Sequence, residues 1–123
     1  MKTIFEKIRD NEIPSFKIYE DENYFAILDI HPKTKGHILL ITKEPYQWVI
    51  DVPSMGEYFS LAQKIGKHIQ KKINATYISF QTFGVDVPHA HIHIVPFYEK
   101  TEHAERYIPQ ENELENLYQL LKM

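Results

Sequence analysis

Apolar and polar residues alternate in several short stretches of the chain, and this period of two is typical of half-buried β-strands. Residues 16–19 alternate in this way, and an apolar run over residues 24–29 follows the turn-forming segment 21–23, which together predict a β-hairpin. Three further strands are predicted over residues 37–42, 76–82 and 89–95. Pro96 is expected to stop the last strand, because proline has no N–H to donate to a sheet ladder.

Helices are predicted where a capping signal precedes apolar residues spaced three and four apart. Thr3 and Glu6 form a capping-box pattern that begins a short helix over about residues 3–10. Ser54 and Glu57 repeat the pattern at the start of a helix of about 20 residues. The apolar face of that helix is predicted at Met55, Phe59, Ala62, Ile65, Ile69 and Ile73.

The order of these elements favours an α+β fold with an antiparallel sheet. Three strands precede the long helix and two follow it, without the regular strand–helix alternation of a parallel sheet. We expect about five antiparallel strands, one long helix and short helices at both ends, the last one over residues 111–122. The 123 residues contain no repeat or linker, which predicts one domain, 1–123, with a core over about 3–97 and a tail and helix over 98–123.

Composition excludes several classes of function. The chain has no cysteine, so disulfides, thiolate zinc sites and cysteine nucleophiles are excluded. Fourteen Lys+Arg against seventeen Asp+Glu give a net charge of −3, which offers no electrostatic basis for binding nucleic acid or anionic membranes. The first eight residues do not form a signal peptide, and the longest apolar run is too short to span a bilayer. We therefore expect a cytoplasmic protein.

Three of the seven histidines alternate along the last predicted strand, and this row is the main candidate for chemistry. His89, His91 and His93 would point to one face of the sheet at intervals of about 6.7 Å. The residues between them are expected to pack a core on the opposite face: Ala90, Ile92 and Ile94.

The pattern of histidines alone is compatible with three interpretations. A zinc ion can be shared by two histidines two positions apart, but the outer pair of the row is roughly 13 Å apart and a further ligand would be needed. Alternatively, an anionic substrate lies along the row, with one neutral imidazole as nucleophile toward phosphorus and the others as donors. In the third interpretation the rings are buried and bonded to backbone carbonyls. Strict alternation, with a further histidine at His37 after Gly36, favours the anionic substrate.

The segment 89–95 resembles the signature of the histidine triad (HIT) family, His-φ-His-φ-His-φ-φ, at every position, where φ is apolar. Segments 3–8, 11–14, 28–32 and 36–39 also resemble the Hint branch of that family in order and spacing. The resemblance implies a HIT-like fold and a nucleotide hydrolase or nucleotidyl transferase that attacks the α-phosphate of a purine nucleotide conjugate. A nucleoside phosphoramidate or a dinucleoside polyphosphate would react through a covalent nucleotidyl-histidine.

The resemblance also implies roles for the histidines and a simple set of partners. His91 would attack phosphorus, and His89 would hold the tautomer of His91. His93 would lie against the phosphate, and His37 would complete the set from the neighbouring strand. No cofactor is implied as a requirement, the need for a divalent metal is left open, and a two-fold homodimer is implied.

Further residues match nucleotide-binding positions of the family. Asp29 matches the residue that binds the ribose hydroxyls, and Gln81 falls where relatives place an amide that contacts the α-phosphate. The purine slot is implied to be lined by Ile4, Phe5, Ile8, Ile27 and Ile30.

The segment just before the triad departs from the family pattern. Many relatives carry Gly-Gln-Ser or Gly-Gln-Thr there, whereas this chain has Gly84, Val85 and Asp86. Valine cannot donate to a phosphate, and a carboxylate repels an anion. These changes keep one alternative open, a nucleotide-binding or regulatory protein with weak or no catalysis. A zinc-binding module is a further alternative.

Several aromatic residues and histidines are left without a single assignment. Tyr46, Trp48 and Tyr58 are candidates for a dimer interface or for a local core. No role is assigned to the remaining histidines, of which the second is expected to be solvated on the long helix: His31, His68 and His103.

Overall fold

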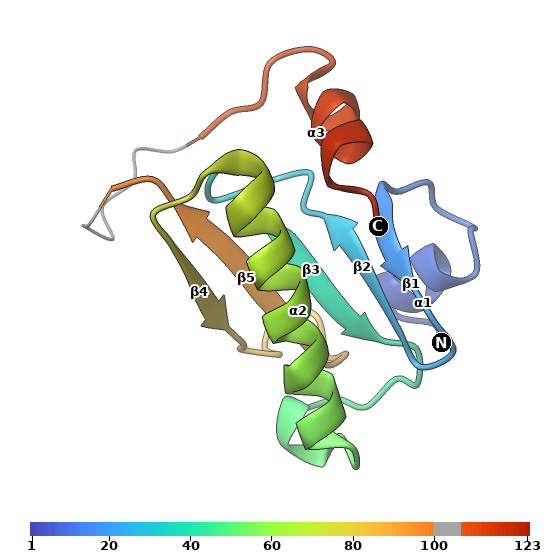
Figure 1. The fold of residues 1–123 in the computed structure, drawn as a ribbon. Helices are drawn as coiled ribbons and strands as arrows, with labels where there is room; N and C mark the ends of the chain where they lie inside the picture. Colours follow the sequence, from blue (N-terminus) through green and yellow to red (C-terminus); the bar gives the residue numbers. More distant parts are fainter. Residues whose placement is uncertain (100–106) are drawn as a thin grey trace.

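One antiparallel sheet of five strands organises the fold in this computed structural model, which describes residues 1–99 and 107–123 (Figure 1). The spatial order of the strands is β1-β2-β3-β5-β4, so β5 lies between β3 and β4. The strands are β1 (Lys17–Glu20), β2 (Tyr24–Leu28), β3 (Ile38–Thr42), β4 (Tyr77–Gln81) and β5 (His91–Phe97). The predicted α+β class and the five antiparallel strands are confirmed, whereas His103 lies outside the described residues.

Helices cover the two faces of the sheet unequally (Figure 1). The long helix α2 (Met55–Ile73) crosses one face, and the short helix α1 (Ile4–Arg9) packs on the other. A 3-10 turn, η1 (Val49–Asp51), precedes α2, and α3 (Glu113–Leu121) packs beside β1 and α2. This arrangement gives the sheet a large core under α2 and a smaller apolar cluster under α1.

Ala90 and the first residues of β5 divide between these two cores as the alternating pattern predicted. Ala90, Ile92 and Ile94 are at most 1% exposed and pack in the large core. The odd positions face the smaller cluster, which is formed by Phe5, Ile8, Phe25, Ile27, Leu39 and Ile41. The histidines therefore lie on the side of the sheet opposite to α2.

Helix α2 buries a wider face than its apolar spacing predicted. Tyr58 is fully buried and donates its hydroxyl proton to the carbonyl of Leu40, so it belongs to the core and is not a candidate for a dimer interface. The capping box predicted at Ser54 and Glu57 does not form. The backbone of Ser54 has φ −100° and ψ 59°, outside the extended conformation from which an N-cap side chain reaches the first turn.

Strand β5 begins and ends two residues later than predicted. His89 precedes the strand because its N–H donates to Val87 and not to the sheet. Pro96 does not stop the strand but pairs with Ile78 of β4. The backbone groups of even-numbered residues in β5 point toward β3. The last residue pair between these two strands is Ile38 with Ile94. The nitrogen of Pro96 lies beyond that pair, so its missing N–H costs the sheet no hydrogen bond.

The C-terminal segment packs against the sheet and α2. Leu117 and Leu121 are buried in the large core, and the N–H of Met123 donates to the carbonyl of Ile18 at 2.7 Å. His68 donates from Nε2 to the carbonyl of Leu121 at 2.9 Å. The expectation that His68 is simply solvated is therefore wrong, because its ring links α2 to α3.

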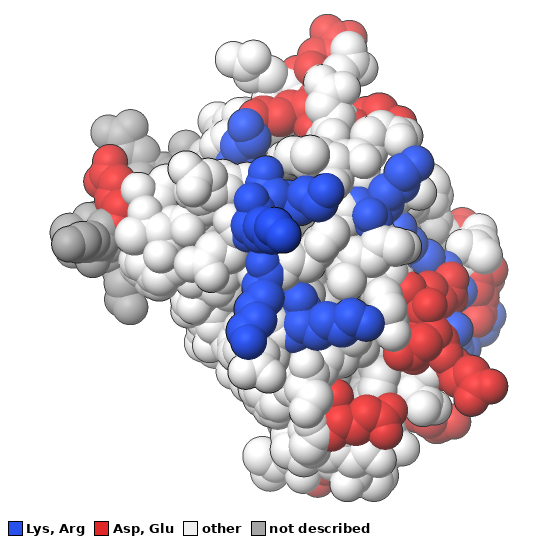
Figure 2. Space-filling view, viewed as in Figure 1, with Lys and Arg blue, Asp and Glu red and all other residues white. Residues whose placement is uncertain are grey.

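Basic side chains gather along the exposed side of α2, as the front of the molecule shows (Figure 2). The helix contributes Lys64, Lys67, Lys71 and Lys72, all exposed. None of the helices in the described residues is long and apolar enough to cross a bilayer.

Candidate active site

His91 and His93 stand on the face of the sheet under α1, in rows that cross neighbouring strands. His93 pairs with Leu39 of β3 on one side and with Gln81 of β4 on the other. His91 pairs with Ile41. Since directly paired residues share a face, Gln81 lies on the same face as the two histidines. Its amide nitrogen donates to the Ser79 hydroxyl at 3.2 Å.

The backbone fixes the tautomer of His91. Its Nδ1 lies 2.6 Å from the carbonyl oxygen of His89, and a carbonyl only accepts, so Nδ1 carries the proton. In a neutral ring the lone pair is then on Nε2. The ring is 6% exposed and packs edge-on against Phe5 at 4.9 Å between centroids. Burial lowers the pKa of His91, against the opposing charges of Asp29 and Asp86, and keeps the ring neutral at pH 7.

A second backbone group sets the tautomers of His37 and His93 together. The N–H of Lys33 donates to Nδ1 of His37 at 2.9 Å, so the proton of the neutral His37 ring is on Nε2. That Nε2–H donates to Nδ1 of His93 at 2.9 Å. His93 must then carry its own proton on Nε2. The site thus combines an unprotonated Nε2 on His91 with an Nε2–H donor on His93. The centroids of the two rings are 5.0 Å apart.

Burial and mutual repulsion keep this pair of rings uncharged. Burial, together with the proximity of His37 and His91, lowers the pKa of His93 to about 4. Burial also lowers the pKa of His37, although Asp29 opposes this effect. Both rings must be neutral to accept these hydrogen bonds, because a charged imidazole has no lone pair.

His89 contributes its carbonyl to the site, but its ring is fully buried. Its Nε2–H donates to the carbonyl of Thr42 at 2.6 Å, and its Nδ1 lies 2.7 Å from the hydroxyl of Thr3. The expectation that three imidazoles face one cleft is therefore wrong for His89. The ring is 0% exposed beneath α1, where it packs edge-on against Phe5 at 5.7 Å between centroids.

Asp29 follows β2 and stands beside the histidine pair. Its Oδ2 is 3.6 Å from Nε2 of His37, and its Oδ1 accepts the N–H of His31 at 2.9 Å. The structure therefore brings Asp29, His37 and His93 together, as expected for residues of one site.

These three side chains form the one group in the described residues with the donor set of a metal site, since their ligand atoms lie within 4.8 Å of one another. A metal on Nε2 of His37 would require the ring proton on Nδ1. The N–H of Lys33 already points at Nδ1 from 2.9 Å, so two protons would face each other. The arrangement does not fit a metal, and the hydrogen bonds from Lys33 to His37 and from His37 to His93 account for both rings.

The residues expected to line the purine slot divide into two groups. Phe5, Ile8 and Ile27 are buried in the smaller apolar cluster. Ile4 and Ile30 are instead 49% and 57% exposed. The buried group packs a core whether or not a ligand is bound, whereas the exposed pair presents apolar surface to solvent.

The β4–β5 loop adds to the site one residue, Phe83, that the sequence did not single out. Phe83 is 66% exposed, and its ring meets that of His93 edge-on at 6.1 Å. Gly84 has φ +80°, and a Cβ there would come within 2.9 Å of the ring of Trp48, so this position requires glycine. Val85 and Asp86 follow, both exposed. An aromatic residue two positions after the end of β4 was the available signal for Phe83.

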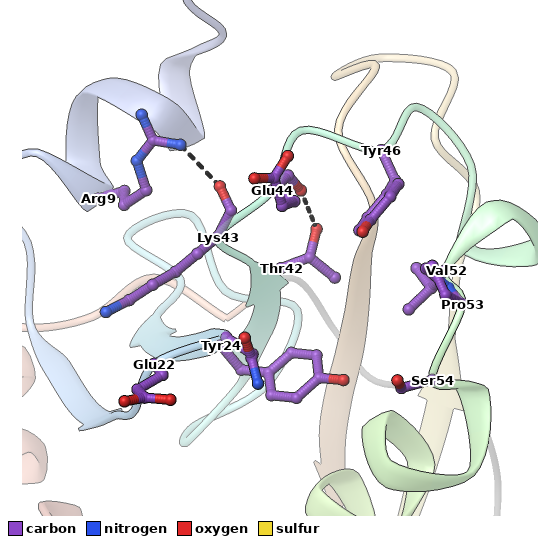
Figure 3. Close-up of a pocket in the computed structure, with 11 residues that line it drawn as sticks. Arg9, Glu22, Tyr24, Thr42, Lys43, Glu44, Tyr46, Val52, Pro53 and Ser54 are labelled. Carbon is purple, nitrogen blue, oxygen red and sulfur yellow. Dashed lines mark hydrogen bonds between the residues drawn. The ribbon is translucent and has the colours of Figure 1, made fainter.

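A hollow of about 340 Å³ lies at the end of β3 (Figure 3). At its rim the guanidinium of Arg9 donates to the carbonyl of Lys43 at 2.7 Å, and the hydroxyl of Thr42 donates to the carbonyl of Glu44. None of the predicted site residues lines it. Its connection to the histidines is through Thr42, whose carbonyl accepts from His89.

Comparisons with known proteins identify the same segment. A family model described as HIT domain matches residues 10–100. The adenosine 5′-monophosphoramidase HNT1 of Saccharomyces cerevisiae is 38% identical over 98 residues, which cover 76% of this chain and 61% of the yeast protein.

Solved structures extend the similarity to the whole fold. A Hit-like protein from Bartonella henselae superposes with a TM-score of 0.87 at 31% identity, over 98% of this chain and 94% of that one. A zinc-bound histidine triad family protein from Mycobacterium smegmatis gives a TM-score of 0.85 at 28% identity, over 99% and 91% of the two chains.

Proposed function

The chain belongs to the HIT domain family, and we propose that it is a nucleotide hydrolase or nucleotidyl transferase that attacks the α-phosphate of a purine nucleotide conjugate. The yeast relative named as an adenosine monophosphoramidase supports this class of substrate. The observation that carries the proposal is the tautomer of His91. Its Nδ1–H is bound to the carbonyl of His89, which leaves Nε2 as a neutral nucleophile beside an N–H donor.

In the proposed first step, Nε2 of His91 attacks the α-phosphorus. A P–N bond forms, the bond from phosphorus to the leaving nitrogen or oxygen breaks with its electron pair, and a leaving nitrogen takes up a proton from the solvent. The Nε2–H of His93 donates to a phosphoryl oxygen, where negative charge develops. The positive charge that forms on the His91 ring is stabilised by the carbonyl of His89 and by the charge of Asp29.

In the second step, water or another acceptor attacks the same phosphorus. The electron pair of the P–N bond returns to Nε2 of His91, and the attacking water loses a proton to the solvent. The tautomer of His91 is the same before and after the cycle, because Nδ1–H stays bound to the backbone.

The binding roles are also proposals. The carboxylate of Asp29 would accept from the ribose hydroxyls, and the amide of Gln81 would donate to the α-phosphate from the neighbouring strand. The base would cover the exposed side chains of Ile4 and Ile30, whose apolar surface is favourable to bury.

The proposal is tested by AMP release from two substrates, an adenosine phosphoramidate and a diadenosine polyphosphate. We expect turnover of at least one of them and a fall of roughly 10³-fold or more in kcat for His91→Asn. The Asn side chain keeps a polar group in place without a nucleophilic nitrogen. Equal turnover by the variant would exclude His91 as the nucleophile.

A second function, nucleotide binding without turnover, is favoured by one observation. The β4–β5 loop presents Val85 and the carboxylate of Asp86 where many relatives carry polar uncharged donors. Calorimetry with AMP separates the two functions: binding with no AMP release from either substrate would support this alternative. A zinc-binding module is not favoured, because the Lys33 N–H occupies the nitrogen that a zinc-bound His37 would need protonated.

We further propose that the protein acts in the cytoplasm, since it has no cysteine, and that it pairs as a two-fold dimer. Strand β4 is an edge strand with Phe80 43% exposed, and isologous pairing is the commonest way to form a dimer. Sedimentation of the wild type and of Phe80→Asp tests the pairing: a single monomeric species for both would contradict it.

A further inference from the structure

The hydroxyl of Thr3 serves two structures at once. It accepts the N–H of Glu6 at 3.1 Å, which caps helix α1, and the side chain of Glu6 returns a bond to the N–H of Thr3. The same hydroxyl lies 2.7 Å from Nδ1 of His89, a residue 86 positions later in the chain. The capping box was evident in the sequence, whereas the bond to His89 was not.

The direction of the bond between Thr3 and His89 follows from the other nitrogen of the ring. Nε2 of His89 faces the carbonyl of Thr42 and therefore carries the proton. Nδ1 then holds a lone pair, and the hydroxyl of Thr3 is its donor. Because the His89 ring is 0% exposed, solvent water does not reach it to replace that donor.

Two contacts connect this bond to the nucleophile. The carbonyl of His89 holds Nδ1–H of His91, so any rotation of residue 89 moves the group that sets the tautomer of His91. Phe5, two positions after Thr3, packs edge-on against the rings of both His89 and His91, at 5.7 and 4.9 Å between centroids. Helix α1 and the nucleophile are therefore held as one unit.

A separate bond anchors the other end of α1. The guanidinium of Arg9 donates to the carbonyl of Lys43, at the rim of the hollow in Figure 3. Arg9 donates no hydrogen bond to a histidine ring in the described residues; its charge contributes to the lowered pKa of His89, but it anchors the helix without a bond to a ring nitrogen. This makes Arg9 a control for the structural part of the role of Thr3.

We propose that Thr3 is a positioning residue for His91: its hydroxyl caps α1 and fixes His89, and through the His89 carbonyl it holds the nucleophile in its reactive tautomer and orientation. This inference rests on the proposed function of His91 as nucleophile. It assigns to the N-terminal helix a part in the reaction beyond its apolar contacts.

Three substitutions of Thr3 separate its two bonds. Thr3→Ser keeps the cap and the donor. Thr3→Asp keeps the cap, since Asp is among the best N-cap residues, but an ionised carboxylate cannot donate to Nδ1 of His89. Thr3→Val keeps the volume of the side chain and loses both bonds. Arg9→Ala removes the opposite anchor of the same helix.

The first readout is steady-state kinetics on the substrate that releases AMP. We expect kcat to fall roughly 10²-fold in Thr3→Asp and Thr3→Val, with a smaller change in KM, because a misplaced nucleophile affects the reacting geometry. Thr3→Ser and Arg9→Ala should stay within about threefold of the wild-type kcat. A fall in Arg9→Ala as large as in Thr3→Asp would assign the effect to helix anchoring alone and overturn the proposal.

The second readout is the ¹⁵N spectrum of the histidine side chains, which needs no turnover. In the wild type and in Thr3→Ser we expect His89 protonated on Nε2 and His91 protonated on Nδ1. In Thr3→Asp we expect His89 to gain a proton on Nδ1, and in Thr3→Val we expect the His91 signal to show mixed tautomers. Unchanged spectra in both variants would overturn the proposal, even if no substrate is turned over. If the variants show these changes but the wild type does not turn over any substrate, only the nucleophilic function is rejected.

Discussion

The two sides of strand β5 are built by different rules. On one side Ala90, Ile92 and Ile94 pack against the sheet and α2, where volume and shape decide which residue fits. On the other side, His91 and His93 each face a partner that accepts or donates at one particular nitrogen. A side chain of the right size would fill the second side, but only imidazoles with the right tautomers would form its bonds.

This difference predicts that the same strand responds to substitution in two separable ways. Changes on the α2 side should alter the free energy of unfolding and leave the chemistry intact. Changes on the histidine side should alter the rate more than the stability, because they leave the apolar packing of the large core in place.

The largest expected effect is on stability, from Ile92→Ala. Ile92 is fully buried at the centre of the large core, and truncation of such a residue leaves a cavity. We expect a loss of about 2–5 kcal/mol in the free energy of unfolding by denaturant titration, with kcat within about threefold of wild type at a temperature where the variant is folded. A loss of activity without a loss of stability would break the separation between the two sides.

The next effect is on rate, from a matched pair at His93. In His93→Asn, the amide oxygen replaces Nδ1 as acceptor for His37, but the donor at Nε2 is lost, so kcat should fall roughly 10²-fold. In His93→Gln, the amide nitrogen falls near the position of Nε2 and should restore part of that loss. Steady-state AMP release measures both variants. Equal rates for Asn and Gln would show that the Nε2–H of His93 does not act as a donor.

A smaller effect is expected on stability as the pH falls. The pKa of His93 is about 4 in the folded chain, below its ordinary value of 6.5. Between these values the unfolded chain binds a proton that the folded chain does not, so stability is full above pH 6.5 and declines toward pH 4. We expect roughly 1–3 kcal/mol of loss from this residue in denaturant titrations over that range.

The control for this pH effect is His93→Asn, which cannot titrate. Its free energy of unfolding should fall less steeply between pH 6.5 and 4 than that of the wild type. Parallel curves for the two proteins would mean that His93 is not held neutral by the fold.

The smallest effect is expected from Asp86→Asn. The charge of Asp86 raises the pKa of His91, against the larger lowering by burial. Its removal should move the acidic limb of the kcat/KM profile slightly to lower pH, and added salt should shrink the difference. A shift toward higher pH would contradict the proposed protonation of His91 on that limb.

Local patterns predicted the helices and strands, apart from some of their ends, and the face of the sheet that carries the candidate site. The alternation of residues 89–95 separated the histidine side from the core side correctly, because a period of two is a property of any extended strand. Pro96 misled the prediction of the strand end, since the cost of a proline depends on whether a neighbouring strand faces its nitrogen.

The hydrogen bonds that define the site could not be predicted in the same way. The donor to His37 is the backbone N–H of Lys33. Almost every residue has a backbone N–H, so the sequence does not indicate which one donates. The partner of His89 is Thr3, which the sequence explains fully as a helix cap. The position of Phe83 against His93 depends on the path of a loop that Gly84 and Trp48 shape together.

The central claim is that Nε2 of His91 bonds to phosphorus during turnover. Rapid mixing of enzyme with a nucleoside phosphoramidate, followed by denaturing quench and peptide mass spectrometry, measures this directly. The account predicts a mass increase of one nucleoside monophosphate on the peptide that contains His91, formed and lost within the time of one turnover and absent in His91→Asn. Turnover with no such adduct, or with the adduct on another residue, would contradict it.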